Sequence, residues 1–365
     1  MTTTTTKTTT LLNIADIEAE ANRLMEPGIR SYLNEGVLNN ETLEANIDAF
    51  KWLRIRPRYM VDVSQRNLSV KVVGGDTIPM PIAVSPFGLN KRFHPDGEFA
   101  TGKGIRQKGT VMIVSSGSTI SIEELATAEP DLIKWFQMFI YRDRNMTIDL
   151  AQRAKQAGFR ALVLTVDHNK MGLRYHNEKN KYSDAYGRAN YKPYNVPGLT
   201  KDVAKDTTWK DIQWIKNEIG LPIVIKGIVT AEDARLAVNN GADAILVSNH
   251  GGRQLDGSPA TLEALPEIVE EVGREVDVYM DGGVRTGADV FKALAIGAKV
   301  VFVGRPVCWG LVCNGSDGVK QVLDILHNEL DNYMTIAGTP TVGDITRNHV
   351  RYVNHYRNNL KILTK

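Results

Sequence analysis

Short apolar runs alternate with helical patterns along the chain from Met80 onward. Most of these runs are continuous Val, Ile and Leu stretches, which are typical of parallel strands covered on both faces. Their alternation with helices predicts βα units around a parallel sheet. The eight runs are Pro81–Ser85, Thr110–Ser115, Ile133–Phe139, Ala161–Asp167, Pro222–Lys226, Ala244–Asn249, Val276–Asp281 and Val300–Gly304. That count predicts a closed (β/α)8 TIM barrel.

Helical patterns with apolar residues near the 3.6-residue period fill the intervals between the predicted strands. The clearest examples are Ile148–Ala157, Ala231–Asn239, Leu262–Val272 and Ala288–Ile296. Glycines stand where these helices should end, at Gly158, Gly241, Gly273 and Gly297. Residues 11–60 predict an N-terminal helical cap, although ordinary packing would explain that segment equally well.

One connection, residues 171–208 after the fourth predicted strand, breaks the regular spacing. It is polar, rich in tyrosine and interrupted by Pro193 and Pro197. A loop of this length without structure of its own is usually either a lid or a mobile excursion. We expect a long loop here and leave both alternatives open. The predicted organisation is a disordered threonine-rich tail over residues 1–10, a single barrel domain over 11–350 and a C-terminal tail over 351–365.

The composition argues against nucleic acid, membranes and metal ions as binding partners. The 365 residues carry a formal net charge of +2 with acidic and basic residues interspersed, so the chain has no basic stripe for nucleic acid and no membrane patch. The spacing of Cys308 and Cys313 fits neither a redox pair nor a zinc site, so we predict no metal and a reducing compartment. Because the N-terminus lacks an apolar signal region, we expect an intracellular protein with a small-molecule partner.

An imidazole and a guanidinium lie close together after the sixth predicted strand, at His250 and Arg253. Histidine is suited to proton transfer near neutral pH, and the planar fork of arginine binds a carboxylate through two hydrogen bonds. The pair predicts proton removal beside a bound carboxylate. The alternative is that His250 caps a strand and Arg253 forms a surface ion pair.

Two glycine-containing turns follow the seventh and eighth predicted strands. They are Asp281-Gly282-Gly283-Val284-Arg285 and Gly304-Arg305-Pro306. Glycines allow backbone N–H groups to approach an anion, and the loops after strands seven and eight commonly bind phosphate in barrels of this class. The turns therefore predict a phosphate site, and two tight turns with solvated arginines are the alternative.

With these motifs in order, the chain resembles the FMN-dependent 2-hydroxyacid oxidases and dehydrogenases, the glycolate oxidase group, from about Ile14 to Asn348. The resemblance implies that FMN is the cofactor and that His250 is the active-site base, supported by Asp167. It also implies that Arg174 and Arg253 bind the substrate carboxylate with help from the Tyr32 hydroxyl. The flavin contacts it implies come from Ser85, Phe87, Gly88, Ser115, Gln137, Thr165, Lys226, Ser248, Asp281, Gly282, Gly283, Arg285, Gly304 and Arg305.

Three departures from the family pattern stand out. Phe139 replaces a substrate-facing tyrosine, so a hydroxyl that would polarise the substrate oxygen is lost. Gly117 stands where many short-chain oxidases have tryptophan, which predicts a wider pocket for larger or aromatic acids. Residues 36–39 replace an acidic cluster, so we expect the N-terminal cap to be packed differently.

The resemblance predicts an (S)-2-hydroxyacid oxidase that converts a 2-hydroxy acid and O2 into a 2-oxo acid and H2O2. It also implies a homo-oligomer, often a tetramer, in a peroxisomal or cytoplasmic location; the C-terminal Leu363-Thr364-Lys365 differs from the serine-lysine-leucine peroxisomal address. The alternatives are a dehydrogenase of the same fold that reduces a quinone or cytochrome, a flavin-binding protein without turnover, and a barrel that binds a sugar phosphate without flavin.

Overall fold

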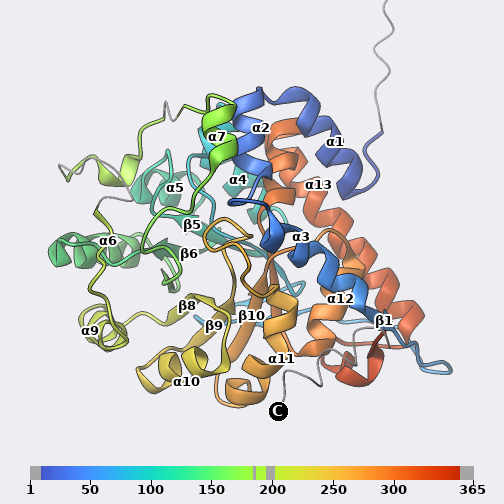
Figure 1. Cartoon of the computed structure of the whole chain (residues 1–365). Helices are drawn as coiled ribbons and strands as arrows, with labels where there is room; N and C mark the ends of the chain where they lie inside the picture. Colours follow the sequence, from blue (N-terminus) through green and yellow to red (C-terminus); the bar gives the residue numbers. More distant parts are fainter. Residues whose placement is uncertain (1–9, 184–185, 195–201, 354–365) are drawn as a thin grey trace, which may run out of the picture.

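The predicted barrel is confirmed by the computed structural model, which describes residues 10–183, 186–194 and 202–353. Parallel strands close in the order β4-β5-β6-β7-β8-β9-β10-β11 (Figure 1). Their bounds are β4 Ile82–Val84, β5 Val111–Ser115, β6 Ile133–Met138, β7 Leu162–Thr165, β8 Ile223–Ile228, β9 Ala244–Val247, β10 Asp277–Asp281 and β11 Val300–Val303. Each strand overlaps one of the predicted runs, because continuous β-branched stretches can be buried on both faces only in such a sheet.

Helices surround the barrel between successive strands (Figure 1). They are α4 Gly97–Arg106, α5 Ile122–Ala128, α6 Arg144–Gln156, α9 Lys210–Ile219, α10 Ala231–Asn239, α11 Thr261–Val272, α12 Gly287–Ile296 and α13 Arg305–Ala337. The four helices named from the sequence are confirmed as α6, α10, α11 and α12. The long helix α13 is interrupted by non-helical backbone at Asn314 and Gly315.

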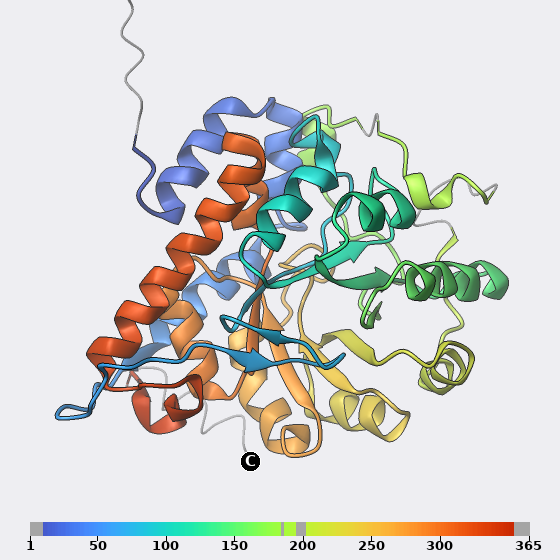
Figure 2. The ribbon, with the colours of Figure 1, turned by 180° about the vertical axis from the view of Figure 1, so that it is seen from behind.

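The interior of the barrel is a dry core that is closed at one end. Trp135, Tyr279 and Phe302 pack against one another inside it, at ring distances of 5.7–5.8 Å. A hairpin of β2 Val70–Lys71 and β3 Thr77–Ile78 lies across the barrel (Figure 2), and the N–H of Val73 in its turn donates to the Tyr279 hydroxyl at 3.0 Å. The hairpin covers the N-terminal ends of the strands. Barrel enzymes place their sites at the opposite, C-terminal ends.

The N-terminal segment forms the predicted helical cap, with α1 Ile14–Leu24, α2 Pro27–Asn34 and α3 Glu41–Asp48. The connection that replaces the family's acidic cluster joins this cap to the barrel: Val37 N donates to Gly252 O at 3.0 Å, and Leu38 N to Leu173 O at 3.1 Å. After the cap, β1 Leu53–Ile55 pairs in antiparallel with β12 Val350–Tyr352, so residues that we had assigned to the C-terminal tail belong to a strand.

The long segment after β7 is partly ordered. It contains the short helices α7 Tyr175–Lys179 and η3 Ala189–Tyr191, so the expectation that it lacks structure of its own is wrong for these parts. Helix α7 packs against α2 (Figure 1), and Tyr182 stacks on Tyr32 with ring centroids 4.7 Å apart. Residues 184–185 and 195–201, like the tail over 1–9 and the last part of the chain from 354, lie outside the described residues. The role of the segment as a lid stays a prediction.

Candidate active site

A cavity of about 590 Å³ lies at the C-terminal end of the barrel strands. This volume falls within the usual range for sites that bind a cofactor or substrate, about 300–1,000 Å³. Every residue predicted for the site lines the cavity except Asp167 and Ser248, which contact the lining residues His250 and Lys226. The lining carries six arginines and one lysine against Glu178 and Asp281. The cavity is therefore strongly cationic and suited to anionic ligands.

His250 and Asp167 form a partly buried pair at the cavity wall. Nδ1 of His250 lies 2.8 Å from Oδ1 of Asp167. His250 has the left-handed backbone conformation, with a φ of +59°, which is uncommon for a residue with a side chain and is typical of functional sites. Gly227 leaves room for the carboxylate, since a Cβ there would stand 2.7 Å from that of Asp167. Barrel strands β7 and β9 thus supply the two groups from loops that meet at one end.

The pKa values of this pair favour a neutral base and an ionised carboxylate near neutral pH. Burial lowers the pKa of His250 below its ordinary value, and the neighbouring Asp167 opposes that shift. Burial alone would raise the pKa of Asp167, but the charges of His250 and Lys226 lower it. Because Nδ1–H of the imidazole donates to the carboxylate, Nε2 is left as the proton acceptor.

Tyr32 lies in a cluster of cations. The guanidinium of Arg92 lies 3.9 Å from its ring centroid, that of Arg253 4.7 Å and that of Arg174 6.0 Å. Burial would raise the pKa of the phenol, but the three arginines lower it to about 8. Burial and the charge of Arg253 also lower the pKa of Arg174 to about 9. Such mutual repulsion between cations is relieved when a carboxylate binds among them.

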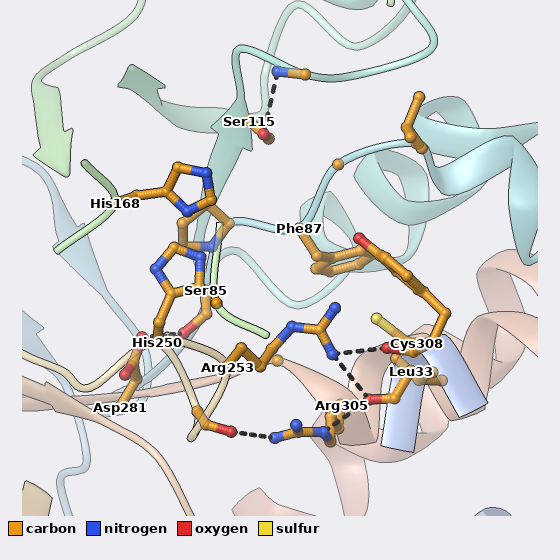
Figure 3. A pocket seen from close by; sticks show the side chains of 18 of the residues that line it. Leu33, Ser85, Phe87, Ser115, His168, His250, Arg253, Asp281, Arg305 and Cys308 are labelled. Carbon is orange, nitrogen blue, oxygen red and sulfur yellow. Dashed lines mark hydrogen bonds between the residues drawn. The ribbon is translucent and has the colours of Figure 1, made fainter. Parts of the chain in front are cut away.

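Arg253 and Arg305 are both held by backbone carbonyls near the end of α2 (Figure 3). Nη1 of Arg253 donates to Tyr32 O at 2.7 Å, and a guanidinium has further N–H donors with which to bind a substrate. All three nitrogens of Arg305 donate to carbonyl oxygens, those of Leu33, Gly251 and Glu35. Arg253 thus combines a structural contact with exposure to the cavity.

Lys226 lies at the floor of the cavity with a side chain that is 4% exposed. Its Nζ donates to Ser248 Oγ at 2.9 Å and lies 3.7 Å from Asp281 Oδ2. Ser85 Oγ donates to the same carboxylate oxygen at 3.0 Å, whereas Asp281 Oδ1 is buried without a hydrogen-bond partner. A buried acceptor of this kind indicates a ligand hydroxyl or N–H that completes the site.

A chain of polar side chains runs across three neighbouring strand ends. Ser115 Oγ donates to Gln137 Oε1 at 3.1 Å, and Gln137 Nε2 donates to Thr165 Oγ1 at 3.1 Å. The barrel register places Ser115 beside Gln137 and Thr165 beside Lys226. The resulting row of donors and acceptors along one wall can bind the polar edge of a planar heterocycle.

The glycine turns can bind an anion and also allow close packing of neighbouring backbone. Gly304 precedes the first residue of α13, and the N-terminus of this long helix provides N–H donors for a phosphate. Gly283, however, has a φ of +77°, and a Cβ there would lie 2.0 Å from the carbonyl oxygen of Asn46. Close packing of α3 on the turn therefore also requires this glycine. Arg285 lies over the ring of Trp309 at 4.9 Å.

The two departures inside the pocket have different neighbours. Phe139 is buried against the ring of His168, with centroids 5.0 Å apart. A Cβ on Gly117 would lie 3.6 Å from Ser115 Oγ and 3.9 Å from Arg188 Nε. The space beside Gly117 is therefore bordered by the Ser115 hydroxyl and by the cation of Arg188.

Several cavity residues were not singled out from the sequence. They are His168, Arg92, Tyr182 and Arg188. His168 directly follows Asp167 at the end of a predicted strand, which was a usable signal. Arg92, Tyr182 and Arg188 come from connections whose path depends on tertiary packing, so no local pattern marks them.

Comparison with known proteins agrees with this geometry. The FMN-dependent dehydrogenase family matches residues 21–352. The chain belongs to this family. A peroxisomal (S)-2-hydroxyacid oxidase of Arabidopsis thaliana is 41% identical over 94% of this chain and 97% of its own length. Glycolate oxidase 1 of Oryza sativa subsp. indica is 41% identical over 93% and 95%. A solved structure of mandelate oxidase with benzoyl-formic acid is 36% identical and has a TM-score of 0.87 over 94% of this chain and 99% of that chain.

The cofactor of the family, FMN, fits the residues present. The unpaired Asp281 Oδ1 and the buried Lys226 provide an acceptor and a cation for its polar groups. The row from Ser115 to Thr165 lies at neighbouring strand ends of the same cavity, and the N-terminus of α13 can bind a phosphate. None of the described helices has the length and apolar composition needed to cross a membrane.

Proposed function

We propose that this protein is an FMN-dependent (S)-2-hydroxyacid oxidase, which converts a 2-hydroxy acid and O2 into a 2-oxo acid and H2O2. The observation that carries the proposal is the partly buried His250–Asp167 pair beside a cationic cavity. Bound FMN supplies the two-electron acceptor, and O2 takes the electrons from it to give H2O2. The named oxidases among the relatives support the choice of reaction class.

The residues divide the work as follows in this proposal. Arg253 and Arg174 bind the substrate carboxylate, and the Tyr32 hydroxyl adds a hydrogen bond. Nε2 of His250 accepts one proton while the C2–H and O–H bonds are broken, and the two electrons and the other hydrogen would pass to bound FMN. The carboxylate of Asp167 stabilises the resulting imidazolium. The charge of Lys226 would stabilise negative charge on FMN when the cofactor accepts electrons.

The cofactor contacts follow the same proposal. Ser85, Phe87 and Gly88 pass along the flavin, and Asp281 binds the ribityl hydroxyls with its free oxygen. Ser115, Gln137 and Thr165 hydrogen-bond the ring edge, with Ser248 holding Lys226. The phosphate is bound at Gly304 with Gly282, Gly283, Arg285 and Arg305. Because all three Arg305 nitrogens donate to carbonyls, its role requires that the side chain exchange one of these contacts.

The substrate class is a 2-hydroxy acid whose side chain can be larger than that of glycolate, including aromatic acids. Gly117 supports this because it adds no side chain to the pocket. We also propose a homo-oligomer and a peroxisomal or cytoplasmic location. The peroxisomal name of one relative supports the first compartment.

The experiment is steady-state H2O2 production by the FMN-loaded protein with glycolate, lactate, longer aliphatic hydroxy acids and mandelate. Stoichiometric formation of 2-oxo acid and H2O2 is the expected result. Oxidation of the acid with quinone or cytochrome, but with no H2O2 in air, would instead identify a dehydrogenase. No oxidation of any acid with any of these acceptors would reject the proposal.

A further inference from the structure

A second imidazole, that of His168, faces the cavity beside the proposed base. The residue is 5% exposed, and its ring lies next to that of His250 at one side of the pocket (Figure 3), with centroids 5.6 Å apart. Among the residues that the structure describes, neither Nδ1 nor Nε2 has a hydrogen-bond partner. Leaving a buried polar group unpaired costs about 1–3 kcal/mol, so a residue retained in this state indicates a ligand that pairs with it.

The protein groups around His168 do not satisfy it. The side chain of Gln254 approaches the ring and opposes the lowering of its pKa, but the amide nitrogen donates to the carbonyls of Asp167 and Lys170, both at 3.0 Å, and within the described part of the chain no hydrogen bond of normal geometry reaches either ring nitrogen. Burial lowers the pKa of His168 to about 4, helped by the charges of His250 and Arg174 and opposed by Asp167. At neutral pH the ring is therefore uncharged and offers one N–H donor and one acceptor.

The N–H donor of His168 lies close to a side chain, Phe139, that provides no hydrogen-bond donor. The ring of Phe139 lies 5.0 Å from that of His168 and cannot form a conventional hydrogen bond. A substrate oxygen whose proton or α-hydrogen is removed at His250 develops negative charge, which a hydrogen-bond donor stabilises. His168 lies beside both His250 and Phe139, and so can supply such a donor from the neighbouring wall.

We propose that His168 donates a hydrogen bond to the C2 oxygen of the bound 2-hydroxy acid and so replaces the contact that Phe139 cannot make. The inference rests on the proposed function, because it assumes that a 2-hydroxy acid binds with its C2 oxygen near His250. The hydrogen bond strengthens as the C2 oxygen gains charge, so it acts mainly on the rate of oxidation rather than on substrate binding. No bond to His168 is formed or broken.

The test is a double-mutant cycle between positions 168 and 139, measured as the rate of flavin reduction under anaerobic conditions and as steady-state kcat and KM. His168→Phe keeps a ring but removes the donor, and it should lower the reduction rate by about 10²-fold with little change in KM, as for removal of one such donor. Phe139→Tyr should change the wild-type rate little. In the His168→Phe background, Phe139→Tyr should raise the reduction rate at least about tenfold, because the introduced phenol hydroxyl can then donate to the same oxygen in place of the missing imidazole.

A second pair of variants covers the case in which His168→Phe does not fold. His168→Gln retains a donor and should keep more activity than His168→Met, with both proteins binding FMN as judged by flavin absorbance. Equal rates in the two variants, a rate in His168→Phe within about twofold of wild type, or a loss that Phe139→Tyr does not restore would overturn the role of His168. If wild-type protein oxidises no 2-hydroxy acid, the proposed function itself fails, which separates the two outcomes.

Discussion

Replacement of Asp167 by Asn probes the proposed base most sharply. Asp167 Oδ1 lies 2.8 Å from His250 Nδ1, and at an effective dielectric constant of about 20 the attraction between this carboxylate and an imidazolium is about 6 kcal/mol. The net free-energy cost of removing one partner from a buried ion pair is smaller, about 3–5 kcal/mol. Since the side chain of His250 is 25% exposed, the lower part of that range applies best.

The expected result is a fall in kcat/KM of about 150-fold to 900-fold, which corresponds to about 3–4 kcal/mol, because each 1.36 kcal/mol is about tenfold in rate. An amide at position 167 can also donate to Nδ1, which would place the imidazole proton on Nε2 and remove the base. The assay is steady-state oxidation combined with flavin absorbance, which should remain unchanged since Asp167 lies behind His250 rather than in the cavity lining.

Asp331→Asn is the matched control. Asp331 pairs with Arg66 at 2.6 Å on a surface where both side chains are about 30% exposed, so its loss should cost at most about 1 kcal/mol of stability and leave kcat/KM unchanged. A rate for Asp167→Asn within about threefold of wild type, with intact flavin binding, would refute the proposed support of His250 by Asp167.

Three further predictions follow from the site and its supports. Because burial lowers the pKa of His250 below 6.5, kcat/KM should stay constant at neutral pH and fall only as the pH drops through that lowered pKa. His250→Gln should abolish oxidation at every pH while FMN stays bound. A fall in kcat/KM that begins above pH 7 on acidification would contradict this. Gly283→Ala should lower the free energy of unfolding by more than about 2 kcal/mol in urea titrations, since its Cβ would stand 2.0 Å from a backbone oxygen, whereas Gly343→Ala, whose Cβ would lie 3.6 Å from its nearest neighbour, should change it little. Gly117→Trp should impair oxidation of mandelate far more than that of glycolate, and equal losses across the panel would reject a size role for Gly117.

The sequence predicted the barrel well because its signal is local. Continuous apolar runs such as Ala244–Asn249 can be buried only within a covered parallel sheet, and polar residues at their ends then converge on one face. His250 and Asp281 were found in this way, whereas Lys226 was named only through the family resemblance; all three line the cavity.

Other features depend on packing that no local pattern encodes. The hairpin that covers the other end of the barrel contains strands of two residues each, too short to show a period. The carbonyl contacts of Arg305 arise from the way α2 ends beside the barrel, and the requirement for Gly283 comes from the approach of Asn46. His168 follows Asp167 at the end of a predicted strand, which marks it as a candidate, but its two unpaired nitrogens become visible only in the folded structure.

The most direct test of the central claim is anaerobic mixing of the FMN-loaded protein with a 2-hydroxy acid while the visible absorbance of the flavin is followed. The account predicts that the absorbance bleaches with an (S)-2-hydroxy acid and returns on admission of O2 with formation of H2O2. Flavin that stays oxidised with glycolate, lactate, longer aliphatic acids and mandelate alike would contradict it.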